Sequence, residues 1–393
     1  IIRICKARAE MNKYCVAADF KKETIHAYAH LNKLYPDSAV TETYGQITHD
    51  HFFESGRVLK DLPNMRLQEL QNYIAYSSRY QIGFNYSLNG SCMGNRDITA
   101  LGMDELAVFL KCLEQAGVTS ITVAIPTLIE FIQHCAPSME IKLSIINQVN
   151  TVNKIKEYEK MGIKRIVIDE SCNRDFDKLR RFQEAFSGSI ELIANSLCHK
   201  DCIYRAFHYN QTAHDSVPAS EKTVSSFYNH RCMIKRASAA EEILKLCWIR
   251  PEDLSFYEKI GIHQFKLQGR HTVYAGNPAK AVEAYFSKSY TGNLLDLLEM
   301  FNSPYRFKVN LQNDRLDGFI SHFTKGDGCR SDCRKCGYCA DFLNSRFDRS
   351  EFDVINGHAN KFYKEIDEFS QLVVRADNKS EALRNDTFQW EQN

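Results

Sequence analysis

The chain has 393 residues, of which 44% are hydrophobic and 25% are charged, and its 50 Lys and Arg residues offset 49 Asp and Glu residues to a formal net charge of +1. This globular composition excludes disorder over most of the chain, and the near-zero charge excludes a global electrostatic attraction to nucleic acid or acidic lipid. No apolar run approaches the roughly 20 residues that span a bilayer, and the first residues lack a clean hydrophobic signal segment. We therefore expect a cytoplasmic protein with no membrane contact.

Three segments repeat one pattern, in which an amphipathic stretch ends at a glycine and a β-branched run follows. They are AGVTSITVAI, MGIKRIVID and IGIHQFKLQG, with Gly117, Gly162 and Gly261 at the turn. Gly supplies the left-handed residue that ends a helix, and the short apolar run fits a strand buried on both faces, as in a parallel sheet. The repeat predicts alternating helices and strands.

In chain order, strands are expected at residues 13–19, 38–43, 81–86, 119–125, 141–146, 164–169, 190–195 and 263–268. Helices are expected at residues 22–35, 65–78, 103–116, 126–135, 151–161, 174–187, 251–260 and 278–287. Eight βα units in about 290 residues predict an α/β fold with a TIM-type (β/α)8 barrel over residues 1–290, and a doubly wound parallel sheet is the alternative.

Two parts of the chain fall outside this rhythm. Residues 197–250 form an insertion rich in Cys, His and Tyr directly after a strand, so we expect a long loop on the active face of the barrel. Residues 291–393 lie beyond the last βα unit and are expected to form a small C-terminal domain with a second group of cysteines.

Polar residues stand near the expected carboxyl ends of the strands, which is where barrel enzymes place their active sites. They are Asp19, Glu42, Asn85, Asn147, Asp169, Asn195 and Gln268, with Arg270 just beyond the last strand. Strand ends turn to solvent in any protein, so a purely structural role is the alternative for each of them.

The run CRSDCRKCGYC places four of the 14 cysteines, Cys329, Cys333, Cys336 and Cys339, within eleven residues. This compact spacing is typical of runs that bind a 4Fe-4S cluster, whereas structural zinc sites separate two pairs of ligands more widely. Zinc remains the alternative. The first three cysteines also have the spacing of radical S-adenosylmethionine enzymes, but in those enzymes the motif comes early in the barrel.

A second group of cysteines, Cys198, Cys202, Cys232 and Cys247, lies in the insertion. Thiolates that converge on a loop above a barrel would hold a cluster beside the substrate pocket. The alternatives are that these cysteines are buried apolar side chains, or that histidines of the insertion such as His199 act as ligands or proton donors.

The runs ANSLCHKDCIYRAFHYN and WIRPEDLSFYEKIGIHQFKLQGR resemble the collagenase-like proteins of family thirty-two among peptidases of unassigned mechanism. The resemblance covers roughly residues 10 to 340 and is most specific in the element Asn-x-x-Cys-x-x-x-Cys-x-x-Arg-x-x-His and in the pair Gly269 and Arg270. It implies an iron-sulfur enzyme, because better studied members are oxygen-independent hydroxylases with a 4Fe-4S cluster held by four cysteines. Those members act on transfer RNA, ribosomal RNA or a quinone precursor, and some take oxygen from prephenate.

By this resemblance, Cys198, Cys202, Cys232 and Cys247 would bind one cluster, and the C-terminal cysteines would bind a second cluster or zinc. We expect an enzyme that hydroxylates, or modifies by a related redox reaction, an RNA, a peptide or a small molecule. The cluster would bind a small-molecule oxygen donor resembling prephenate. Arg250 and Arg270 would hold anionic groups, and Asp19, Glu42 or His199 would move protons.

Two other functions stay open. Members of the resembling family are named for a collagenolytic activity, but this chain has no HExxH, no GxSxG and no papain-like Cys context. A noncatalytic partner subunit of a modification complex is the further alternative, since related hydroxylases act as paired proteins. The fold itself does not choose between these functions.

Overall fold

The computed structural model describes residues 10–49, 53–217, 223–224, 226–325, 329 and 332–382. Its centre is a closed barrel of eight strands whose order around the barrel follows their order in the chain. The strands are β1 (Asn12–Ala17), β2 (Ser38–Gly45), β3 (Gly83–Leu88), β4 (Ser120–Val123), β5 (Glu140–Leu143), β6 (Arg165–Val167), β7 (Ser189–Ile193) and β8 (Gln264–Leu267). Because β8 pairs in parallel with β1, the sheet has no edge, which confirms the predicted barrel and excludes an open doubly wound sheet.

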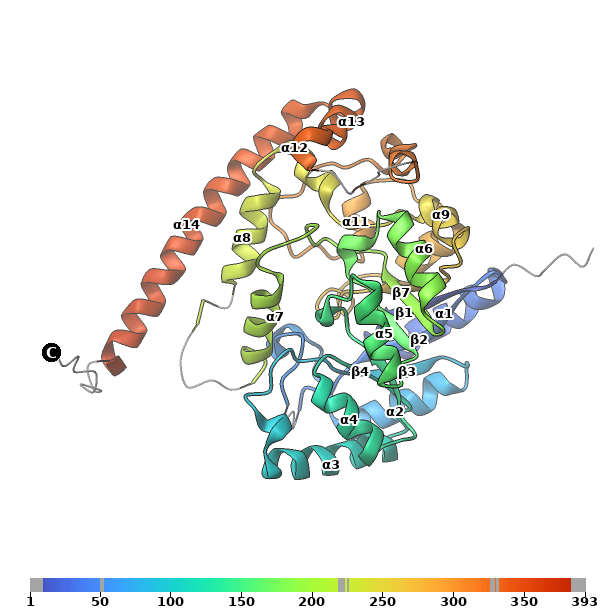
Figure 1. Cartoon of the computed structure of the whole chain (residues 1–393). Helices are drawn as coiled ribbons and strands as arrows, with labels where there is room; N and C mark the ends of the chain where they lie inside the picture. Colours follow the sequence, from blue (N-terminus) through green and yellow to red (C-terminus); the bar gives the residue numbers. More distant parts are fainter. Residues whose placement is uncertain are drawn as a thin grey trace, which may run out of the picture.

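Helices surround the barrel and alternate with its strands along the chain (Figure 1). They are α1 (Lys22–Leu34), α2 (Leu67–Ser78), α3 (Ala100–Gln115), α4 (Pro126–Cys135), α5 (Val152–Lys160), α6 (Phe176–Ala185), α9 (Leu254–Glu258) and α10 (Pro278–Ser287). The three repeat glycines end their helices with positive φ, at +90° for Gly117, +80° for Gly162 and +81° for Gly261. Glycine adopts this left-handed conformation without strain, which explains why it recurs where these helices end.

The insertion is not the long loop that we expected. It contains two helices of ten residues each, α7 (Arg205–His214) and α8 (Phe227–Arg236), followed by a 3₁₀ segment over Ala240–Lys245. The correction has a physical reason, since these helices are short, polar and rich in His and Tyr, and gain their order from contacts with the rest of the protein.

The C-terminal part begins with α11 (Leu294–Leu298) and continues through α12 (Cys333–Cys336) and α13 (Tyr338–Arg346) to the long helix α14 (Arg349–Ala382). Its apolar side chains as far as Phe352 belong to the same hydrophobic cluster as the barrel strands. Helix α14 runs alongside α8 (Figure 1), where Arg231 donates to Asp367 at 2.6 Å. No helix among the described residues is both long enough and apolar enough to cross a membrane.

Candidate active site at the barrel mouth

The carboxyl ends of β3 to β5 surround a cavity of about 270 Å³, which α7 covers on one side. Its lining consists of Ser91, Ala124, Ile125, Pro126, Ile146, Asn147, Gln148, Ala206, Tyr209 and Asn210. Asn147 was expected at a strand end and does reach this cavity. Its amide nitrogen donates to the Ala124 carbonyl at 2.6 Å, and its buried amide oxygen has no partner among the described residues. A polar cavity at this end of a barrel is the position at which such folds bind substrates.

Next to the cavity, Arg205 of α7 connects the insertion to the end of β6. Its guanidinium donates to the Asp169 carboxylate, to the Ser171 hydroxyl at 3.1 Å and to the His199 carbonyl, and lies 3.6 Å from a Glu170 oxygen. All three charged groups are buried. Through its contacts with Asp169, Glu170 and the His199 carbonyl, the Arg205 guanidinium holds α7 over the barrel mouth.

Glu170 also faces the first cysteine of the insertion. Burial raises the pKa of Glu170, while Arg205 and a hydrogen bond with the Cys198 side chain oppose that rise. Burial and Glu170 raise the pKa of the Cys198 thiol well above its ordinary value. A thiol in this environment does not provide the free thiolate that a cysteine peptidase requires.

The thiols of the insertion lie near one another. Cys198 and Cys232 interact electrostatically, as do Cys232 and Cys202, and the Cys247 backbone N–H donates to the Cys198 carbonyl at 3.0 Å. The free thiols of Cys198, Cys202 and Cys232 therefore form a group of neighbouring donors beside the mouth, the ligand chemistry that iron-sulfur clusters use, and Cys247 joins this group through its backbone contact with Cys198. Within the described ranges, no three His, Cys, Asp or Glu side chains are already arranged as a metal site.

The C-terminal cysteines approach the same loop. Lys200 donates to the Cys329 carbonyl, and Cys329, Cys333 and Cys339 interact electrostatically with one another. The Cys336 sulfur lies 3.8 Å from the His322 imidazole, whose ring stacks on Tyr338. Lys200 thus connects the loop of the first cysteine group to the second group, although the two bonded residues are 129 positions apart in the sequence.

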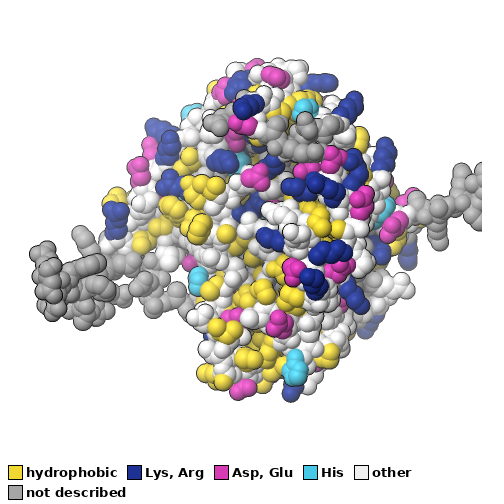
Figure 2. Space-filling view, in the orientation of Figure 1, with side chains coloured by type: hydrophobic (Ala, Val, Ile, Leu, Met, Phe, Trp, Pro, Cys, Tyr) yellow, Lys and Arg dark blue, Asp and Glu magenta, His cyan; other side chains and the backbone are white. Residues whose placement is uncertain are grey.

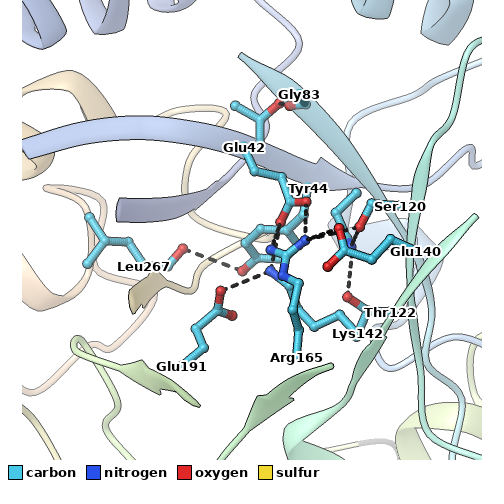
Figure 3. A network of polar contacts seen from close by, with 12 residues as sticks. Glu42, Tyr44, Gly83, Ser120, Thr122, Glu140, Lys142, Arg165, Glu191 and Leu267 are labelled. Carbon is cyan, nitrogen blue, oxygen red and sulfur yellow. Dashed lines mark hydrogen bonds and ion pairs between the residues drawn. The ribbon is translucent and has the colours of Figure 1, made fainter. Parts of the chain in front are cut away.

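Glu42 is not at the carboxyl end of its strand, so that prediction is wrong. Strand β2 continues to Gly45, and Glu42 pairs in register with Gly83, the first residue of β3. Inside the barrel its carboxylate contacts Lys142 at 2.7 Å and Arg165 through both oxygens, at 3.0 and 2.9 Å (Figure 3). Burial alone would raise the pKa of Glu42, but the two cations lower it below its ordinary value. Glu42 is a permanently charged member of the barrel core and does not move protons at the mouth.

The other two expected proton carriers are also engaged. Asp19 does follow β1, but its carboxylate accepts from the Thr24 hydroxyl at 2.6 Å and the Lys21 backbone N–H at 3.1 Å, and so holds the start of α1. Burial, together with nearby cations of α8, lowers the pKa of His199 to about 3. A neutral imidazole under α8 fits a packing role better than proton transfer.

The two predicted anion-binding arginines differ. Arg250 is buried and donates to the Asn313 carbonyl at 3.0 Å and the Asp317 carboxylate at 2.8 Å, so the prediction that it binds a ligand is wrong. It attaches the C-terminal part to the barrel instead. Arg270 does lie at the mouth, where it donates to the side chains of Gln46 and Asn89.

Four residues of the mouth were missed: Gln46, Arg57, Glu170 and Tyr209. Gln46 would have been found if the second strand had been drawn two residues longer, because it directly follows Gly45. Glu170 is the neighbour of the expected Asp169, and Tyr209 lies one residue past the family element. For Arg57, no local pattern in the sequence gives a signal.

The face of the molecule that Figure 2 shows carries charged side chains of both signs. On the face that Figure 2 shows, Lys and Arg side chains are interspersed with Asp and Glu side chains. Such mixing gives no stripe of one sign on that face, in agreement with the net charge of +1.

Residues 55–215 match the model of a family described as Peptidase family U32. The protein named "Uncharacterized protease MJ1657" from Methanocaldococcus jannaschii is 28% identical over 292 residues, which make up 73% of this chain and 83% of that protein. Among similar solved structures, the U32 peptidase Mk0906 has 15% identity and a TM-score of 0.46, with 68% of this chain and 95% of that chain covered. The tryptophan synthase A-subunit of Pyrococcus furiosus has 12% identity and a TM-score of 0.37, with 75% of this chain and 97% of that chain covered. The residues that match the U32 family model include the end of β6, Cys198, Cys202 and Arg205, so the similarity covers the part of the chain that carries the first two cysteines of the insertion.

Proposed function

We propose that this chain is an iron-sulfur enzyme that carries out an oxygen-independent hydroxylation, or a related redox modification, at the barrel mouth. The observation that supports the proposal best is the group of neighbouring, reduced thiols of Cys198, Cys202 and Cys232 beside the polar cavity. Redox-active clusters need soft thiolate ligands and a nearby pocket in which the substrate is held.

In this proposal Cys198, Cys202, Cys232 and Cys247 would hold a 4Fe-4S cluster, which would supply one-electron chemistry beside the cavity when it is bound. Arg205 positions the loop that carries the first two ligands, because it ties the His199 carbonyl to Asp169. Tyr209 and Asn147 line the cavity and would orient a substrate there. The C-terminal cysteines would hold a second 4Fe-4S cluster or a zinc ion.

A peptidase remains the alternative because of the printed names of the family and of the relative. Within the described residues, the thiol–imidazole contact that the structure contains joins Cys336 and His322 in the C-terminal part, not at the barrel mouth. A cysteine peptidase needs its thiol and imidazole in hydrogen-bond contact beside the substrate. The barrel mouth, as far as it is described, therefore does not contain the dyad of a cysteine peptidase.

Metal analysis tests this proposal. The full chain would be purified without oxygen, and iron, acid-labile sulfide and zinc would be measured per polypeptide. About eight irons with matching sulfide would indicate two 4Fe-4S clusters, and about four would indicate one. The double variant Cys198→Ser/Cys202→Ser should lose about four irons and the modification activity, while Cys112→Ser, on the outer helix α3, should keep both. Zinc alone, no metal, or gelatin cleavage by a metal-free preparation would overturn the redox function.

A further inference from the structure

Among the described residues, two guanidinium groups at the mouth, those of Arg57 and Arg270, form no ion pair with a carboxylate. Arg270 is only 6% exposed, and its side chain donates to the amide oxygens of Gln46 and, at 3.3 Å, Asn89. Arg57, in the segment after β2, is half-buried and donates to the Gly56 carbonyl at 3.0 Å. In the part of the chain that the structure describes, no carboxylate forms an ion pair with either guanidinium. The direct hydrogen-bond acceptors of both cations are therefore neutral, and the carboxylate that interacts with Arg57 electrostatically, Glu170, is not in contact with it.

The free-energy cost of burying the Arg270 guanidinium without a contacting carboxylate indicates a site for an anion. A buried charge that is matched only by amides is unfavourable, and a second cation nearby makes it more so. Burial and Arg57 lower the pKa of Arg270 to about 10. Groups perturbed in this way in a concave site are typical of ligand-binding positions, because the ligand supplies the missing charge.

Gln46 adds a third donor to the same place. It is 2% exposed, and its amide oxygen already accepts from the Ser55 hydroxyl and from Arg270. These two donors fix the orientation of the amide group. Its amide nitrogen is then a buried donor with no acceptor among the described residues.

The backbone holds these donors in place through tight glycine contacts. Gly269 has φ +138°, and a Cβ there would lie 2.5 Å from the Thr272 hydroxyl, so only glycine fits the turn that presents Arg270. A Cβ at Gly90 would lie 2.7 Å from the Glu54 carbonyl oxygen. The segments after β2 and β3 are thus packed backbone against backbone at this point, which keeps Asn89 beside Arg270.

We propose that Arg57, Arg270 and Gln46 form a binding site for the oxyanion group of a small-molecule ligand, either a carboxylate or a phosphate. The body of the ligand would extend toward the 270 Å³ cavity, since Arg57 interacts electrostatically with Tyr209, which lines it. Planar guanidinium and amide donors suit the oxygen atoms of both anion types. The inference rests on the proposed function only in placing the substrate at this mouth, because anion binding itself requires no cluster.

Calorimetric titration of the full chain with inorganic phosphate and with malonate tests the site. We expect saturable binding of at least one probe, with Arg57→Gln and Arg270→Gln each weakening it about 10- to 100-fold, as expected for a lost charged hydrogen bond. Arg79→Gln changes an exposed arginine of the α2 terminus and should leave binding unchanged. If Arg270→Gln does not fold by circular dichroism, the half-buried Arg57 still provides the test.

Each outcome decides something. Binding of phosphate alone would indicate a phosphate-bearing ligand, and binding of malonate alone would indicate a carboxylate. No binding by the unmodified chain, or equal binding by Arg57→Gln and the unmodified chain, would overturn the anion site. Iron content of the same preparations separates the two proposals, since anion binding by an iron-free chain would overturn only the proposed function.

Discussion

The charge network inside the barrel predicts how the protein responds to the loss of Lys142. The Lys142 ammonium is fully buried and contacts Glu42 at 2.7 Å and Glu191 at 2.9 Å (Figure 3). Lys142→Met keeps the apolar stem and removes the charge. Glu42 would keep its two contacts with Arg165. Glu191, whose other carboxylate oxygen lacks a partner among the described residues, would lose its contacting cation and keep only the longer-range interactions with Arg165 and Lys266.

The size of the effect follows from what Glu191 can then do. Remaining ionised without its partner costs about 3 to 5 kcal/mol. Taking up a proton at pH 7 costs about 4 kcal/mol, because an ordinary Glu has a pKa of about 4.3 and each pH unit is worth about 1.4 kcal/mol. At pH 5 the same protonation costs only about 1 kcal/mol. In the variant, the pKa of the folded state is raised above that of the unfolded state, so the loss of stability grows as the pH rises from about 4 to 7.

Urea unfolding followed by circular dichroism at pH 5 and pH 7 measures this difference. Lys142→Met should lose about 3 to 4 kcal/mol at pH 7 and clearly less at pH 5, and adding Glu191→Gln should remove most of the pH-dependent part. Lys160→Met, which breaks an exposed ion pair with Glu157, should change stability by less than about 1 kcal/mol. Equal losses at the two pH values, or no recovery in the double variant, would refute the account of a stranded carboxylate.

Three further predictions test the mouth and its supports. Gly269→Ala should lower the free energy of unfolding by more than about 1 kcal/mol and weaken anion binding, whereas Gly357→Ala, in the open face of α14, should raise stability by about 0.5 to 1 kcal/mol. Burial and Arg57 lower the pKa of His208 to about 4, so its neutral form stabilises the fold above about pH 6.5 and this contribution is lost as the pH falls. The melting temperature of His208→Gln should therefore fall less between pH 7.5 and pH 5 than that of the unmodified chain, and an equal fall would contradict the buried neutral imidazole. Arg174→Lys should lower the free energy of unfolding in urea by about 1 to 3 kcal/mol. Arg174 contacts both the Leu244 and Trp248 carbonyls and stacks on the Trp248 ring at 4.2 Å, which Lys cannot do at once. An unchanged urea midpoint would show that the stacking is dispensable.

The barrel could be predicted because its signals are local. Strands β4, β6 and β8 are short runs after a helix stop, and the stop glycines at 117, 162 and 261 have the positive φ that the pattern required. The helices of the insertion could not be predicted in this way. Their order depends on long-range contacts, such as Arg205 with Asp169 and Arg231 with Asp367, that no stretch of sequence displays.

The same distinction explains the outcome for the candidate residues. Glu42 was placed at a strand end because the second strand was expected to stop at residue 43, two residues before its end at Gly45. Its partner Lys142 lies 100 residues away, and only the closed barrel brings the two together. The acceptors of Arg250, at residues 313 and 317, are also distant in the sequence. With no acceptor visible nearby, Arg250 was assigned to a ligand. Arg270 was placed correctly because the Gly-Arg pair itself forms the turn at the end of β8.

The charged side chains inside the barrel fall into two layers, one in the interior and one nearer the mouth. In the interior, Glu42 and Glu191 are balanced by Lys142 and Arg165, so that layer is neutral and fixed. Nearer the mouth, Lys266 stands over the Tyr44 ring at 3.9 Å, and Arg270 and Arg57 follow with no carboxylate partner among the described residues. A chain with a net charge of only +1 thus concentrates positive potential at one concave place, where low-dielectric walls focus it. Since no carboxylate of the described residues contacts Arg57 or Arg270, an anionic ligand at the mouth is the arrangement that would lower their energy.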